Sequence, residues 1–271
     1  MKLHFEKGKP LVMGIVNLTP DSFYDGGKYS TLDSILQRVE KLIAEGASII
    51  DIGAVSTRPG ASLPDTAEEL QRLIPVLQLI KSHFPDTLLS VDTFRSEVAI
   101  QAIKEGASII NDISGGTFDD KMFETVTKSD VYYVLMHIQG TPQHMQSNPC
   151  YTDVTAEILE FFKKRIQKLN ALGYDKIILD PGFGFGKTIE HNYTLLQQLP
   201  EFVKTGYPVL AGLSRKSMIY RLLNILPAEA LNGTTVLNTI ALLNGASLLR
   251  VHDVKEAIEA IKLTEMLCTV K

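Results

Sequence analysis

Polar and charged side chains stand at the ends of short apolar runs along this sequence, where a buried strand would give way to a loop. Carboxylates and amides at such places bind the polar edges of small ligands, and arginine, lysine and histidine bind anions. The residues at these ends are Asn17, Asp51, Asp92, Asn111, His137, Asp180, Ser214, Arg215, Arg250 and His252. Asp51, two residues before Gly53, could serve only to hold its loop. As a set, these residues favour a site for a polar ligand.

The apolar runs themselves are typical of buried parallel strands. Three of them resemble one another, because a glycine that can end a helix precedes each aliphatic run. These three are EGASIIDIG (residues 45–53), EGASIINDI (105–113) and NGASLLRVHD (244–253). Five further runs occupy residues 10–17, 87–93, 131–137, 176–182 and 208–214.

Helical periodicity separates these strands. It is clear at residues 34–45, 67–84, 154–172, 192–199, 216–223 and 233–243, and weaker at 119–127. Alternating strands and helices predict parallel βαβ units. Eight such units in 271 residues match the size of a (β/α)8 barrel, so we expect one α/β domain over residues 1–271, with a doubly wound open sheet as the alternative. In such barrels the chemistry lies at the C-terminal ends of the strands, where the polar residues stand.

Composition excludes several classes of function. The formal net charge of −4, without a basic motif, gives no support to nucleic-acid binding. No apolar run approaches the roughly 18 residues of a membrane-spanning helix, and Leu11 to Val16 is too short for a signal peptide. With only Cys150 and Cys268, neither a disulfide framework nor a zinc site is expected. The composition therefore favours a soluble cytoplasmic protein.

The segment PGFGFGKT (residues 181–188) imitates two phosphate-binding motifs without matching either. A P-loop needs glycine five positions before Gly186, where this chain has Pro181, and the glycine spacing is not that of a dinucleotide fingerprint. We expect the glycines to let the backbone approach a ligand closely. Phe185 between them could pack in the interior or form a wall for a flat substrate. The chain also lacks G-x-S-x-G, which argues against a serine hydrolase.

Eight segments, in order along the chain, resemble the dihydropteroate synthase family, whose members join a dihydropterin to 4-aminobenzoate. They are MGIVNLTPDSFYDGG (13–27), DIGAVSTRPGA (51–61), SVDT (90–93), NDISGG (111–116), MHIQGTPQHMQ (136–146), LDPGFGFGK (179–187), GLSRKS (212–217) and RVHD (250–253). Together they cover the chain from its first strand to its last. Two positions depart from the family, which often has serine where Tyr24 stands and glutamate where Val55 stands.

The resemblance implies a role for most of the strand-end residues. Asp180 would accept hydrogen bonds from the guanidine-like edge of the pterin, with Asp92 and Asn111 completing that edge. Lys216 would reach the carbonyl and ring-nitrogen side, and Met136 would pack on a ring face. The implied catalytic residues are Asp92, Lys216, Arg250 and His252, and the last two would bind the diphosphate.

The resemblance also implies a Mg²⁺ ion, for which the amide oxygen of Asn17 is the family's contact. The 4-aminobenzoate side of the site would consist of Thr57, Arg58, Pro59, Phe185 and Ser217. Diphosphate would leave before the amine attacks, in an SN1-like reaction that needs no enzyme nucleophile. A homodimer is implied as well, with the terminal helices as a plausible interface.

Two other functions remain open from the sequence. A pterin-binding methyltransferase module also uses Asp and Asn at strand ends, but it would not need GLSRKS or RVHD. A catalytically silent paralogue that binds pterin is the second alternative, and Tyr24 and Val55 are the hints of it.

Overall fold

The computed structural model describes residues 3–6, 8–18, 31–55 and 64–269, and of Thr31 only the backbone. In these ranges eight parallel strands form one sheet in the order β6-β5-β4-β3-β2-β1-β8-β7. The strands are β1 (Leu11–Asn17), β2 (Ile49–Gly53), β3 (Leu88–Asp92), β4 (Ile109–Asp112), β5 (Tyr132–Met136), β6 (Ile177–Asp180), β7 (Leu210–Ala211) and β8 (Leu248–Val251). A parallel bridge between Leu179 and Val209 joins β6 to β7 and closes the ring. The predicted (β/α)8 barrel is therefore confirmed, and the open sheet is wrong.

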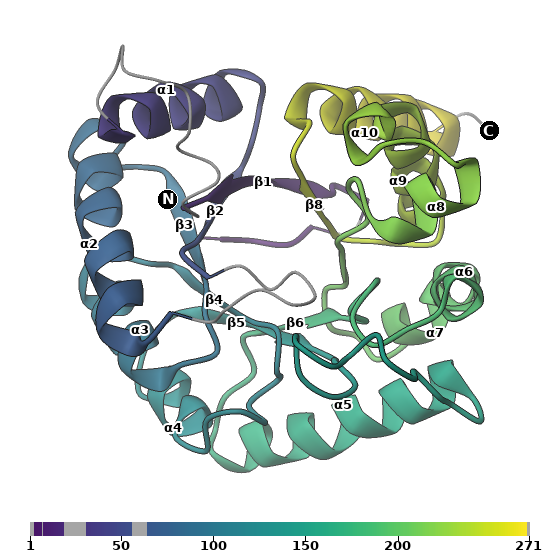
Figure 1. The fold of residues 1–271 in the computed structure, drawn as a ribbon, viewed down its shortest axis with the longest axis horizontal. Helices are drawn as coiled ribbons and strands as arrows, with labels where there is room; N and C mark the ends of the chain where they lie inside the picture. The colour runs from purple at the N-terminus through teal and green to yellow at the C-terminus, as the bar shows by residue number, and fades with distance from the viewer. Residues whose placement is uncertain (1–2, 7, 19–30, 56–63, 270–271) are drawn as a thin grey trace.

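Helices surround the strands on the outside of the ring (Figure 1). They are α1 (Thr31–Ala44), α2 (Thr66–His83), α3 (Ser96–Lys104), α4 (Met122–Thr127), α5 (Val154–Ala171), α6 (Ile189–Gln197), α7 (Leu199–Val203), α8 (Ser217–Leu223), α9 (Leu231–Leu243) and α10 (Val254–Thr269), with a 3-10 turn, η2 (Pro227–Glu229). All seven helical patterns in the sequence correspond to helices. The patterns did not include α3, α7 or α10, although α10 buries Val254, Ala257 and Ile261 at helical spacing.

The barrel interior is filled in layers, because alternate residues of a strand point to the same face. The lowest layer takes one apolar residue from each strand, namely Met13, Ile49, Leu88, Ile109, Val134, Ile178, Leu210 and Leu248. Leu3 and Phe5, at the N-terminus, pack against this layer. The next inward positions, two residues further along each strand, include Asp51, Asn111, Met136, Asp180 and Arg250. The apolar layer thus forms a floor beneath the polar side chains.

The strand β7 is shorter than its apolar run predicts. It contains only Leu210 and Ala211, whereas the run spans residues 208–214. Pro208 has no N–H to donate to a ladder, and glycine at position 212 weakens a strand interior.

Candidate active site

Arg250 lies at the centre of a buried ionic cluster above the apolar floor. Its guanidinium donates from Nε to Asp51 Oδ2 at 2.7 Å and from Nη2 to Asp92 Oδ2 at 2.9 Å. Asn111 Nδ2 lies 3.4 Å from both carboxylate oxygens of Asp51. Strands β2, β3, β4 and β8 thus bring together four residues that are up to 199 positions apart in the sequence.

Electrostatics in this cluster favour a charged Arg250 and a protonatable Asp92. Burial raises the pKa of Asp92 to about 7, although Arg250 opposes the shift. Burial opposes the charge of Arg250, but the carboxylates of Asp51 and Asp92 outweigh it and raise the pKa of the guanidinium. A fixed cation therefore stands beside a carboxyl group whose pKa burial raises.

Asp180 and Lys216 face a common space next to this cluster. Asp180, which is 5% exposed at the end of β6, accepts a hydrogen bond of 2.7 Å from the N–H of Gly182. An ideal Cβ placed on Gly212 would lie 3.9 Å from Lys216 Nζ and 4.0 Å from Asp180 Oδ2. Gly212 therefore leaves room between an anion and a cation. A carboxylate and an ammonium so placed can bind the donor edge and the acceptor edge of one ligand.

The pKa values of this pair move towards each other. Burial raises the pKa of Asp180, and Lys216 opposes the shift. Burial lowers the pKa of Lys216 to about 8, against the attraction of Asp180. Lys216 Nζ also donates to the carbonyl oxygen of Phe183 and lies 4.5 Å from the ring centroid of Phe185. Lys216 is thus held by loop residues beyond β6 and remains mostly protonated at neutral pH.

An apolar cluster lies at the mouth of the barrel beside these charges. Met136 is buried in it together with Ile113, Ile138 and Met145, and Phe94, Phe118 and Phe185 pack against them. Met136 and Phe185 therefore pack in one apolar cluster at the barrel mouth, and their predicted contacts with a flat ring stay predictions.

Lys187 holds the glycine-rich loop between β6 and α6 from within. Its ammonium, buried at 3% exposure, donates to the carbonyls of Gly182 and Phe185, each at 2.9 Å, and lies 3.2 Å from His137 Nδ1. A Cβ on Gly182 would come within 2.0 Å of the His137 carbonyl oxygen. Close packing of the chain against itself therefore requires this glycine, whereas the sequence had suggested close approach to a ligand.

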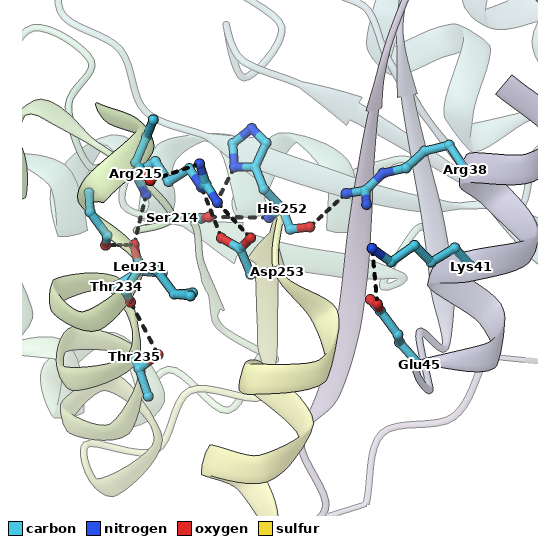
Figure 2. A network of polar contacts seen from close by, with 12 residues as sticks. Arg38, Lys41, Glu45, Ser214, Arg215, Leu231, Thr234, Thr235, His252 and Asp253 are labelled. Atoms are coloured by element: carbon cyan, nitrogen blue, oxygen red, sulfur yellow. Dashed lines mark hydrogen bonds and ion pairs between the residues drawn. The ribbon is translucent and has the colours of Figure 1, made fainter. Parts of the chain in front are cut away.

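A second polar network joins the loops after β7 and β8 (Figure 2). Arg215 binds Asp253 with two hydrogen bonds of 2.9 and 2.8 Å, and Arg38 donates to the backbone carbonyl of His252 at 2.6 Å. Ser214 contacts both the ring and the backbone N–H of His252. Arg215 has a left-handed backbone (φ 54°), which is unusual for a residue with a side chain. The ion pair with Asp253 therefore holds a strained turn immediately before Lys216.

The remaining predicted residues lie around the rim or outside the described ranges. Asn17 ends β1 with an exposed side chain, and Ser217 begins α8. Val55 is 9% exposed. Thr57, Arg58 and Pro59, with Tyr24, lie outside the described residues, so their predicted roles stay predictions.

A separate hollow of about 570 Å³ lies outside the barrel, between α5 and the segment that follows β4. Its lining includes Gly116, Thr117, Arg165 and Lys168. None of the strand-end residues takes part in it. The convergent charges at the barrel mouth, rather than this hollow, therefore mark the candidate active site.

Sequence reasoning gave no specific contact to four residues that hold the site together. Asp51, Ser214 and Arg215 were recognised as polar residues at strand ends, with a loop-holding role as the alternative for Asp51, and Lys187 was not singled out. The burial of Lys187 and the pairing of Arg215 with Asp253 have no signal in the sequence, because both depend on how the loops fold and meet.

Comparisons with known proteins agree with this geometry. A family model described as pterin binding enzyme matches residues 13–252. The dihydropteroate synthase of Escherichia coli strain K12 is 45% identical over 264 residues, which cover 97% of this chain and 93% of the relative. A solved structure of the Yersinia pestis dihydropteroate synthase with a sulfonamide drug has a TM-score of 0.92 at 42% identity and covers 100% of both chains. A Xanthomonas albilineans dihydropteroate synthase with 4-aminobenzoic acid has a TM-score of 0.90 at 41% identity, covering 97% of this chain and 94% of that one. This protein therefore belongs to the dihydropteroate synthase family of pterin-binding enzymes.

Proposed function

We propose that this protein condenses (7,8-dihydropterin-6-yl)methyl diphosphate with 4-aminobenzoate to form 7,8-dihydropteroate and diphosphate in folate biosynthesis. The observation that carries the proposal is the space at Gly212, with Asp180 and Lys216 on either side and Arg250 next to it. The relatives that match this chain over nearly its whole length are dihydropteroate synthases, and one solved relative contains 7,8-dihydropteroate.

In this proposal the pterin lies between the carboxylate and the ammonium. Asp180 accepts hydrogen bonds from the guanidine-like edge, and Asn111 and Asp92 complete the contact. Lys216 donates to the carbonyl and ring-nitrogen side, while Met136 packs on a face of the ring. These buried partners also exclude water from the methylene carbon that reacts.

The chemistry is a substitution at that methylene carbon. The C–O bond to the diphosphate breaks, its electron pair leaves with the diphosphate, and the cation is delocalised over the pterin ring. The amine of 4-aminobenzoate then forms the C–N bond and loses a proton. Arg250 and His252 hold the leaving diphosphate, and positioning with electrostatic stabilisation supplies the catalysis.

Asn17 is the candidate contact for a Mg²⁺ ion. Its amide is exposed at the C-terminal end of β1, on the side of the barrel where the diphosphate would lie. Within the described ranges no group of three or more His, Cys, Asp or Glu residues is placed to hold a metal. An amide oxygen fits an ion that takes most of its ligands from water and substrate phosphates. When bound, Mg²⁺ would neutralise charge on the departing diphosphate.

The homodimer that the resemblance implies is supported by the exposed apolar residues of neighbouring elements. They occur on α8, the turn after it, α9 and α10, which lie next to one another in Figure 1: Leu222, Leu223, Leu226, Val236, Ile240, Leu243, Leu263, Met266 and Leu267. Sedimentation velocity tests the dimer, which Leu263→Glu should dissociate. Leu172→Glu, at a similarly exposed position at the end of α5, is the control. A monomeric wild type would refute the dimer.

Cytoplasmic location stays a prediction. The structural finding that bears on it is limited: among the described helices, none has the length and apolar character needed to cross a bilayer.

One assay tests the activity against both alternatives. The protein is incubated with the pterin diphosphate, 4-aminobenzoate and Mg²⁺, and dihydropteroate is measured by liquid chromatography and mass spectrometry. We expect dihydropteroate and diphosphate in equal amounts, and none with Asp180→Ala. Pterin binding without product would indicate the silent paralogue. Transfer of a methyl group from a methylated pterin, without dihydropteroate, would indicate the methyltransferase module.

A further inference from the structure

Ser214 and His252 face each other across two neighbouring loops, one after β7 and one after β8. The Ser214 Oγ atom accepts a hydrogen bond of 3.1 Å from the backbone N–H of His252. The same Oγ lies 2.9 Å from Nδ1 of the His252 ring (Figure 2). One hydroxyl therefore contacts both the main chain and the side chain of His252.

The donors and acceptors in this contact favour one tautomer of the ring. A serine hydroxyl has one hydrogen to donate, and its oxygen accepts from the His252 main chain. If Nδ1 carried the proton, the Ser214 oxygen would accept from two N–H groups of His252, and the hydroxyl hydrogen would have no acceptor in His252. If Nδ1 is unprotonated, the hydroxyl donates to it and every group is satisfied. The second arrangement leaves the ring proton on Nε2.

We propose that Ser214 is a positioning residue that holds His252 as the neutral Nε2–H tautomer, so that the ring donates a hydrogen bond to the diphosphate leaving group. Within the described part of the chain, the hydrogen bonds of His252 are made by its backbone N–H, its backbone carbonyl and Nδ1, so Nε2 is left for a ligand. The opposite tautomer would direct a lone pair of Nε2 towards an anion and repel it. The role given to the diphosphate rests on the proposed function, whereas the tautomer does not.

The charged neighbours of His252 support a neutral ring. Burial, together with the nearby Arg250, lowers the pKa of His252 to about 4; Asp253 raises it, and Arg215 and Arg38 lower it further. Arg250 already supplies a fixed positive charge. His252 therefore contributes a directed donor in a place where a second cation would be costly.

Nitrogen-15 NMR on protein labelled at its histidines tests the tautomer without any turnover. Long-range ¹⁵N–¹H correlations distinguish the two ring nitrogens, and His252→Gln identifies the signals among the six histidines. We expect a neutral ring with the proton on Nε2 at pH 7, a mixture of tautomers in Ser214→Ala, and the wild-type pattern in Ser214→Thr, which keeps the hydroxyl. A proton on Nδ1 in the wild type, or an unchanged spectrum in Ser214→Ala, would overturn the proposal.

Kinetics then test what the tautomer does. Loss of one hydrogen bond predicts that Ser214→Ala lowers kcat/KM for the pterin diphosphate by about 3- to 10-fold. The same change in a His252→Gln background should cost less than about 2-fold, since an amide needs no tautomer to donate. Thr235→Ala, which removes a hydroxyl within α9, is the matched control. Equal losses in both backgrounds would indicate a merely structural serine and would refute the positioning role.

An inactive wild-type protein would contradict the proposed function. The NMR result would still decide whether Ser214 sets the tautomer of His252. In that case binding of inorganic diphosphate, measured by calorimetry, replaces turnover. Ser214→Ala is then expected to weaken diphosphate binding by a similar factor, and unchanged binding would overturn the role towards the anion.

Discussion

Replacing Asp51 with asparagine should show that this buried carboxylate holds Arg250 in place. The substitution keeps the size of the side chain and removes its charge. Asp51 is fully buried, and its Oδ2 accepts from Nε of Arg250 at 2.7 Å and lies 2.6 Å from Nη2. From the sequence alone, Asp51 could have served only to hold its loop. The experiment therefore distinguishes that role from the positioning of Arg250.

The magnitude follows from these contacts. Breaking a buried ion pair by removing one partner costs about 3–5 kcal/mol. Arg250 retains Asp92 at 2.9 Å, and its side chain is 20% exposed, so we expect the lower end, about 3 kcal/mol of unfolding free energy. With a denaturant slope of about 3 kcal/mol/M, the urea midpoint falls by about 1 M. Turnover should fall about 100-fold, because a misplaced guanidinium no longer meets the leaving group.

Urea unfolding followed by circular dichroism measures the first effect, and the dihydropteroate assay measures the second. Asp130→Asn is the matched control, since Asp130 forms an ion pair with Lys176 but is 84% exposed. Exposed pairs contribute little, so this variant should resemble the wild type in both measurements. Stability and turnover near wild type in Asp51→Asn would show that Asp92 alone positions Arg250. A loss of stability with full turnover would refute the positioning role.

Three further predictions concern the pterin, the metal and pH. Asp180→Ala should abolish pterin binding in calorimetry while the circular dichroism spectrum is kept, because a buried charge-assisted contact is lost at a cost of about 3–5 kcal/mol; affinity within a few-fold of wild type would contradict the pterin site. Turnover should require Mg²⁺, and Asn17→Ala should raise the Mg²⁺ concentration for half-maximal rate; full turnover in excess chelator would remove the metal. Pterin affinity should decrease as the pH rises through the Lys216 pKa of about 8, because the ammonium loses the proton it donates; Lys216→Met should lack this decrease, and a persisting decrease would assign it to another group.

Much of this protein could be predicted from local patterns. Buried runs such as Ile177 to Leu179 predict parallel strands, because both faces of such a strand are covered. The polar residue that ends each run, such as Asp180, marks the C-terminal rim, where a barrel places its chemistry. The fold and the strand-end candidates follow from this alternation, because strand direction puts every C-terminal end on one side, whereas the roles of the residues and the loop candidates such as Lys216 came from the family resemblance.

The tertiary structure decided the contacts between those ends. Asp51 holds Arg250 across 199 positions of sequence, and this depends on β1, β2 and β8 being neighbours in the closed ring. The double contact of Ser214 with His252 likewise requires the loops after β7 and β8 to meet. Sequence patterns report how a residue relates to its own strand or helix. Hydrogen bonds between loops depend on distances that only the closed barrel determines, and these bonds set the charge and the tautomer of the groups at the site.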